Sequence, residues 1–188
     1  DTPFPFILSL PQLRTEEILL AAVEQEPSVR LVRGCTVSSC TLEEGGVRAQ
    51  AVQAGKHTAF RGRYLCGCDG KHSTIRAEMG SNWRGRNLAD TFAMADIVDE
   101  TGLGETAHLW FTSSGSVESF PLPRGVRRWI VQTDSYDPDP PVGAVQNFVA
   151  DRAGVELSRS RELWRSAFRT ERRRASSWAR PPIFLAGD

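Results

Sequence analysis

One short stretch constrains the fold of this chain more than any other, the residues from Tyr64 to Arg76. Its first five residues are mostly apolar and suit a short β-strand. Asp69-Gly70 is a turn pair, because glycine accepts backbone angles that are closed to other residues. Ser73–Met79 can form a helix that ends at Gly80. A turn that opens a helix presents backbone N–H groups and a positive dipole end, which suits phosphate.

The same stretch resembles the Asp-Gly fingerprint of the FAD-dependent aromatic hydroxylases, the class A flavoprotein monooxygenases typified by para-hydroxybenzoate hydroxylase. Members have a strand ending in Cys-Asp-Gly, then His or a small residue, then Ser or Gly, and an Arg seven residues after the Asp. The matching positions are Asp69, Gly70, His72, Ser73 and Arg76. An Asp-Gly turn alone is a common connecting turn, so the longer pattern carries the resemblance.

Two further segments resemble the same family. Pro181–Asp188 resembles its second fingerprint, an apolar strand that delivers Gly187 and Asp188 to the flavin. The resemblance implies that Asp188 hydrogen-bonds the ribose or ribityl part of FAD, while the glycine lets the backbone come close. Leu8–Glu16 resembles the family's Leu-Pro-Gln-x-x-Thr-Glu segment, whose glutamine, here Gln12, touches the flavin side chain. By residue type alone, Gln12 is equally well a polar residue of a loop.

The fold class expected from this resemblance is α/β (α+β). It comprises part of an FAD-binding Rossmann-like domain with a small β-meander, plus an antiparallel-sheet substrate domain. Residues 1–82 would form the FAD-binding part, residues 83–177 the substrate-binding middle domain, and residues 178–188 a return strand. The residue pattern predicts strands in the following segments: Phe4–Leu10, Val29–Val32, Cys35–Leu42, Val47–Ala54, Thr58–Cys68, Thr91–Val98, Ala107–Thr112, Val117–Leu122 and Arg128–Thr133.

Two helices and one ambiguous segment complete the prediction. Thr15 is expected to cap a helix with apolar residues at helical spacing, and a second helix is expected over Val142–Ala153. Glu162–Arg174 carries five arginines. It is either a solvated strand or helix face, or a patch that contacts phosphate of NADPH or of nucleic acid.

Composition narrows the class of protein. The 188 residues contain 23 basic and 23 acidic side chains, so the net charge gives no support for a nucleic-acid partner. No run of about 18 apolar residues and no signal peptide is visible. Four cysteines without metal-ligand spacing predict reduced, buried thiols, no metal site and a cytoplasmic location. A dinucleotide-binding G-x-G-x-x-G is also missing, which suggests an interior segment of a longer protein.

The function implied by the resemblance is an FAD-dependent monooxygenase that uses NAD(P)H and O2 to hydroxylate an aromatic or polyketide-like small molecule. Gln12, Gly187 and Asp188 would contact FAD, and Asp69 and Gly70 would lie where FAD meets the pyridine nucleotide. His72 and Arg76 would contact the phosphates of NAD(P)H. Catalytic residues and oligomeric state are not assigned, and no membrane partner is expected. The alternatives are a related flavin-dependent halogenase or reductase, or an inactive segment that acts as a binding domain.

Overall fold

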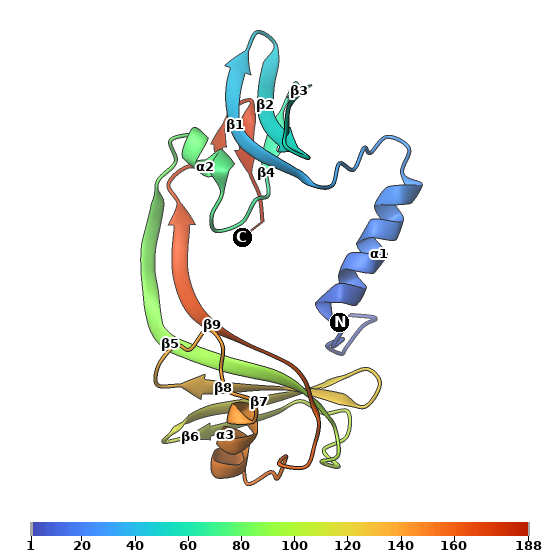
Figure 1. Cartoon of the computed structure of the whole chain (residues 1–188), viewed down its shortest axis with the longest axis vertical. Helices are drawn as coiled ribbons and strands as arrows, with labels where there is room; N and C mark the ends of the chain where they lie inside the picture. The colour runs from blue at the N-terminus through green and yellow to red at the C-terminus, as the bar shows by residue number, and fades with distance from the viewer. Residues whose placement is uncertain (1, 188) are drawn as a thin grey trace. The chain divides into compact units, whose positions relative to one another are not determined.

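The computed structural model describes residues 2–187, which divide into two compact units. The first unit contains the chain up to Glu26 together with Asn87–Thr170, and the second contains Pro27–Arg86 together with the chain from Glu171 onwards. Two long strands, β5 (Trp83–Val98) and β9 (Glu162–Ala175), each have residues in both units (Figure 1).

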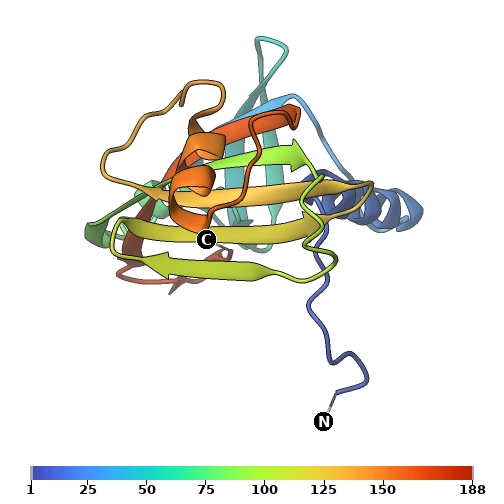
Figure 2. The same cartoon turned by 90° about the horizontal axis from the view of Figure 1, so that it is seen from below.

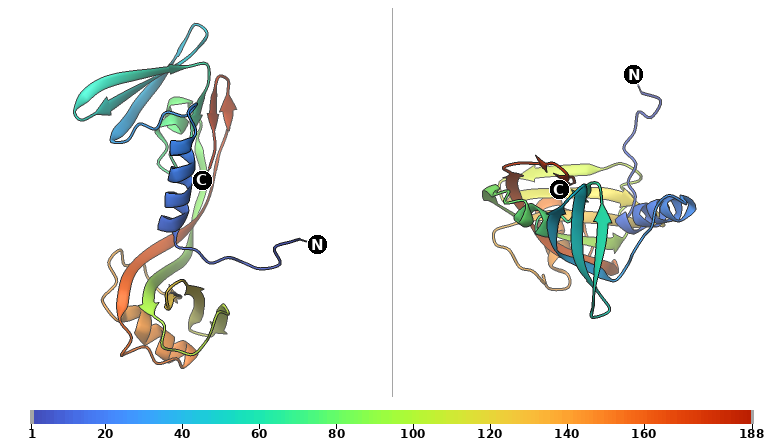
Figure 3. Two further views of the ribbon diagram at one scale, coloured as in Figure 1. Left: turned by 90° about the vertical axis from the view of Figure 1, so that its right-hand side faces the viewer. Right: turned by 90° about the horizontal axis from the view of Figure 1, so that it is seen from above.

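The second unit contains the predicted meander. Strands β1 (Cys35–Glu43), β2 (Gly46–Gln53) and β3 (Lys56–Gly62) form an antiparallel sheet in that order (Figure 3). The single strand predicted for Thr58–Cys68 is two strands, because the chain leaves the meander after Gly62. It enters a different sheet as β4 (Leu65–Gly67).

The sheet that contains β4 joins two distant parts of the sequence. Strand β11 (Ile183–Leu185) pairs parallel with β4 and antiparallel with β10 (Ala179–Arg180). The short helix α2 (Thr74–Glu78) follows β4. One hydrophobic core connects the meander, α2 and β11, and its buried members are Cys40, Val47, Ile75, Met79 and Ile183.

The first unit is built on a five-stranded antiparallel sheet. Its order is β6 (His108–Thr112), β7 (Gly115–Leu122), β8 (Val126–Thr133), β5, β9. Helix α3 (Ala144–Ala153) packs on one face (Figure 2). The four strands predicted in this region are confirmed, and the ambiguous arginine-rich segment is the fifth strand.

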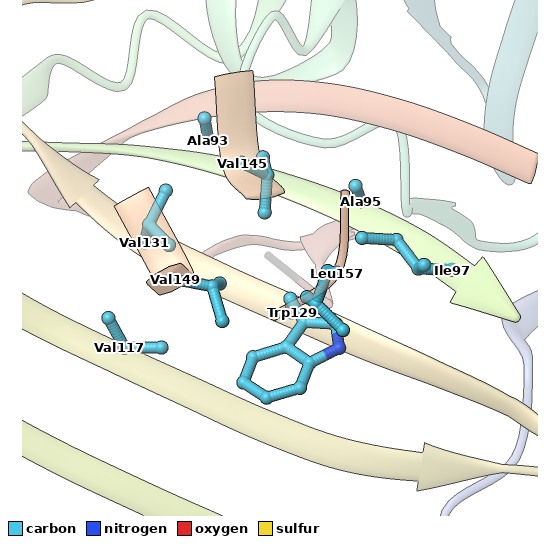
Figure 4. Close-up of a cluster of buried hydrophobic side chains, with 9 residues drawn as sticks. All are labelled: Ala93, Ala95, Ile97, Val117, Trp129, Val131, Val145, Val149 and Leu157. Atoms are coloured by element: carbon cyan, nitrogen blue, oxygen red, sulfur yellow. The ribbon is translucent and has the colours of Figure 1, made fainter. Parts of the chain in front are cut away.

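The core of the first unit lies between the sheet and α3 (Figure 4). Alternate residues of β5 point into it, so Ala93, Ala95 and Ile97 are buried while their neighbours are not. Trp129 of β8 is fully buried at its centre. This clean alternation explains why the sequence pattern predicted these strands correctly.

Three expectations about the N-terminal part are wrong. Phe4–Leu10 and Val29–Val32 are not strands. Phe4 and Ile7 are 69% and 99% exposed, so the first segment has no sheet to bury its apolar side chains. Helix α1 (Gln12–Gln25) begins after Pro11, three residues before the predicted cap at Thr15.

The expectation of buried cysteines holds only in part. Cys40 is buried, but Cys66 and Cys68 are exposed and all four thiols are free. In residues 2–187 no helix is long and apolar enough to span a membrane.

Candidate cofactor-binding site

A pocket of about 500 Å³ lies within the second unit. Two of its walls come from segments more than a hundred residues apart in the sequence: the turn after β4 and the segment after β11. Its lining residues include Gly67, Asp69, Gly70, Ser73, Arg76, Trp83, Arg173, Arg174, Trp178, Ala186 and Gly187.

Parallel pairing of β4 and β11 brings these two segments together. Leu65 lies opposite Ile183 and Gly67 opposite Leu185, so both strands end at the same edge of the sheet. Ligands of open α/β sheets bind at the carboxyl ends of the strands. Asp69 and Gly70 of the first predicted corner and Gly187 of the second therefore border one pocket.

Side-chain caps hold the turn after β4. Asp69 accepts hydrogen bonds from the Ser73 hydroxyl and from the backbone N–H of Ile75, the latter at 3.1 Å. The Ser73 oxygen accepts from the backbone N–H of Arg76 at 2.9 Å, as an N-cap residue does. The Ile75 and Arg76 amides are therefore already bound. Anion binding in this pocket would rely on arginine side chains instead of the start of α2.

The same contacts set the charge of Asp69. Burial, the largest single influence, raises its pKa, but hydrogen bonds from Ser73 and from the backbone N–H groups of Ile75, Asp69 and Thr74 together lower it. The net result is a pKa below the usual value for aspartate. Asp69 is thus a carboxylate at neutral pH, committed to its own turn.

Arg76 both stabilises the turn after β4 and lines the pocket. Its guanidinium lies 4.3 Å from the ring centroid of Trp83, a cation–π contact. It also donates to the backbone oxygens of Gly70 and Lys71, at 3.4 and 3.0 Å. These bonds use two of its nitrogens and fix the fork at the pocket wall, where it retains donors for a ligand.

Two glycines shape the pocket. A Cβ on Gly67 would lie 2.7 Å from the Cβ of Ile75, so only glycine lets β4 pack this closely on α2. Gly187 has a φ of +78°, in the left-handed region that favours glycine. Both positions keep bare backbone at the pocket wall.

The other predicted site residues lie elsewhere or outside the description. His72 is exposed and does not line the pocket. Gln12 belongs to the first unit, at the start of α1, where its side-chain nitrogen donates to Glu16 at 2.8 Å. Asp188 lies outside the described residues.

Sequence reasoning missed the aromatic wall of the pocket. Trp178 is 64% exposed and lines it beside Arg174, and Trp83 lines it beneath Arg76. The side chain of Arg174 is exposed and has no hydrogen-bond or ion-pair partner among residues 2–187. The signal available was the run of arginines followed by a tryptophan just before the closing strand. No group of three metal-ligating side chains occurs in the described part of the chain.

Comparison with known proteins gives a consistent picture. A family model described as an FAD binding domain matches residues 1–188. The 6-methylpretetramide 4-monooxygenase of Streptomyces rimosus is 30% identical over 196 residues, covering all of this chain and 34% of the relative. The chain thus spans about a third of that relative's length.

Solved structures agree with this match. An anhydrotetracycline hydroxylase from Streptomyces rimosus superposes with a TM-score of 0.77 and 27% identity, over 100% of this chain and 38% of the other. An aromatic hydroxylase from angucycline biosynthesis gives a TM-score of 0.73 and 29% identity, over 95% and 37%. The match over the whole chain and the shared fold lead to one conclusion: the chain belongs to the FAD-binding domain family of the flavin-dependent aromatic hydroxylases and monooxygenases.

Proposed function

We propose that the protein is an FAD-dependent monooxygenase that uses NAD(P)H and O2 to hydroxylate an aromatic or polyketide-like small molecule. One observation carries the proposal: the Asp69-Gly70 corner and the Ala186-Gly187 corner border a single pocket. Relatives that match the whole chain are named monooxygenases of 6-methylpretetramide and of anhydrotetracycline.

The residues of the pocket fit part of a dinucleotide. Gly67 and Gly187 expose backbone, and Trp83 and Trp178 offer aromatic faces. Among the described lining residues, three arginines outnumber the one carboxylate, that of Asp69. An anionic, partly aromatic ligand matches this combination, since arginine binds phosphate through paired N–H donors and aromatic rings stack on planar groups. A cavity of about 500 Å³ is too small for a whole FAD and suits one portion of it or of a pyridine nucleotide.

We assign roles on this basis. Gly187, Asp188 and Gln12 bind FAD, and the Asp69-Gly70 turn lies where FAD and the pyridine nucleotide meet. Arg76 contacts phosphate of NAD(P)H, with His72 at the exposed end of the same turn. Arg174 is added to this group because its guanidinium lines the pocket with no partner in residues 2–187.

Bound FAD, reduced by NAD(P)H, would supply the activation of dioxygen and the transfer of one oxygen atom to the substrate. The chain's own residues would bind and orient. Asp69 and Ser73 hold the turn in one shape, and Arg76, fixed over Trp83, offers preorganised charge. The side chains of the middle region, residues 83–177, would bind the substrate on the five-stranded sheet.

The test is expression of the complete protein that contains this chain. We expect a yellow, flavin-containing product that oxidises NAD(P)H faster with substrate and yields a product heavier by one oxygen atom. Arg174→Ala should raise the KM for NAD(P)H about tenfold, the effect of losing one hydrogen bond to a charged group, and leave flavin content unchanged. Arg159→Ala, an exposed arginine outside the pocket, is the matched control.

Different outcomes would support the alternatives. A flavin-containing protein that incorporates halide or only reduces its substrate would be a halogenase or reductase. A colourless protein that does not oxidise NAD(P)H would defeat every enzyme assignment and leave a binding domain.

A further inference from the structure

The five-stranded sheet of the first unit has one covered face and one open face. Ala93, Ala95 and Ile97 of β5 point to the face that packs on α3 (Figure 4). Phe92 and Met94 alternate with them and point to the other face, which no helix of this unit's core covers. We call this second face the open face.

Most of the open face is apolar or aromatic. Phe92 stacks on Phe168 of β9, with ring centroids 5.1 Å apart. On β6, Leu109 and Phe111 are 52% and 81% exposed. Ile130 of β8 pairs with Met94 of β5 and continues the apolar surface. An apolar and aromatic surface of this kind suits an aromatic ring system.

The cation of the open face is already neutralised. Arg128 of β8 pairs directly with Asp96 of β5, and two of its nitrogens donate to the two carboxylate oxygens at 2.7 and 2.9 Å. Its guanidinium also lies 5.2 Å from the ring of Trp164. Among the strand residues of this face that lie within Asn87–Thr170, no other arginine or lysine is present. An anionic ligand would therefore find no free positive charge here.

One carboxylate on this face has no partner. Glu118 of β7 lies directly opposite Leu109 on one side and Ile130 on the other. Its side chain is partly buried and makes no hydrogen bond or ion pair with residues 2–187, while its backbone belongs to the sheet. Cross-strand neighbours on one face contact each other, so two apolar side chains flank its carboxylate.

We infer that Glu118 is a specificity-determining residue that accepts a hydrogen bond from a phenolic hydroxyl of a neutral aromatic substrate. The inference rests on the proposed function and names the substrate class of that enzyme. A flat ligand on the open face would shield Glu118 from water, which is costly unless the ligand supplies a donor. A phenol supplies that donor, whereas an aromatic carboxylate adds a second negative charge beside Glu118.

The test uses the complete, flavin-loaded protein and three matched probes: 2-naphthol, 2-methoxynaphthalene and 2-naphthoate. Binding is measured by isothermal titration calorimetry, which requires no turnover. We expect 2-naphthol to bind at least about tenfold tighter than either other probe, the usual effect of a hydrogen bond to a charged group. Glu118→Leu should weaken 2-naphthol about tenfold and tighten 2-naphthoate. Glu156→Gln, an exposed glutamate after α3, should change neither.

Two results would overturn the inference. One is wild-type protein that binds 2-naphthoate as tightly as 2-naphthol. The other is Glu118→Leu protein, folded by circular dichroism, that binds 2-naphthol like wild type. Flavin content and NAD(P)H oxidation are recorded on the same samples. Their loss in wild type contradicts the proposed function, while the probe preferences test Glu118 separately.

Discussion

The side chain of Asp69 lies 3.1 Å from the backbone nitrogen of Ile75 and accepts its hydrogen bond. This bond connects the turn after β4 to the second residue of α2. Ile75 is itself buried in the core that includes Ile183 of β11. The position of the pocket wall thus depends on both the cap and the core.

Replacing Asp69 by Asn should destabilise the protein by about 1 kcal/mol, since a charged acceptor is exchanged for a neutral one. The pKa of Asp69 is below its usual value when folded, so its stabilisation is complete above the unfolded pKa of about 4 and is lost as pH falls through the folded pKa. The difference in unfolding free energy between wild type and Asp69→Asn should be constant near neutrality and shrink below about pH 4. Urea titrations at several pH values measure it; a difference that grows on acidification would contradict it.

Ser73→Ala removes the N-cap of α2. Its oxygen accepts from the Arg76 amide at 2.9 Å and the side chain is buried, so we expect a loss of about 1 kcal/mol and weaker flavin retention. Thermal unfolding and flavin absorbance after dialysis measure the two effects. Ser114→Ala, at an exposed turn with no bond from its hydroxyl within the described chain, is the control and should be neutral.

Arg127 and the partly exposed Asp99 form an ion pair in the first unit. The Arg127 side chain is fully buried and donates to Asp99 at 2.9 Å and to Ser119 at 2.9 Å. Arg127→Met should cost about 3 kcal/mol, because it leaves a carboxylate without its cation. The double variant Arg127→Met/Asp99→Asn should lose less than the sum of the two single changes. Denaturant unfolding measures all three, and strict additivity would show that the pair is not coupled.

Gln12 is predicted to contact the flavin side chain. Gln12→Ala in the complete protein should weaken FAD binding about tenfold, the effect of one lost hydrogen bond and its unpaired partner. Gln25→Ala, at the other end of α1, is matched in residue type and should leave FAD affinity unchanged. Fluorescence titration of the flavin-free protein measures both. Equal affinities for Gln12→Ala and wild type would remove Gln12 from the site.

The alternation of apolar and polar residues predicted the strands that have one buried face and one open face. Thr91–Val98 and Arg128–Thr133 alternate between the α3 core and the open face, so hydrophobic periodicity identified them. It failed at Phe4–Leu10, where apolar residues without a sheet partner form no strand. The arginine-rich strand β9 stayed ambiguous, because charged side chains suit any exposed element.

The residues of the candidate site likewise fall into those that the sequence predicted and those that only the structure revealed. Asp69, Gly70 and Gly187 were named from short motifs, which depend on local turn geometry and close backbone approach. Trp178 and Arg174 could not be assigned, because their place in the pocket follows from how β9 and β10 lead into β11. His72 carries the motif but lies outside the pocket, since a residue in a turn can point either way.

The sequence by itself determined the family, the two Gly/Asp corners and the alternating strands, because each is written in residues that are close neighbours along the chain. Only the tertiary structure decided that Asp69, Gly70 and Gly187 line one pocket and that the amides at the start of α2 are already bound. It also decided that the side chain of Glu118 lies without a partner between Leu109 and Ile130. Parallel pairing of β4 with β11 and the register of β6, β7 and β8 set these juxtapositions. Such pairings join residues distant in the chain, and no local pattern encodes which strands will meet.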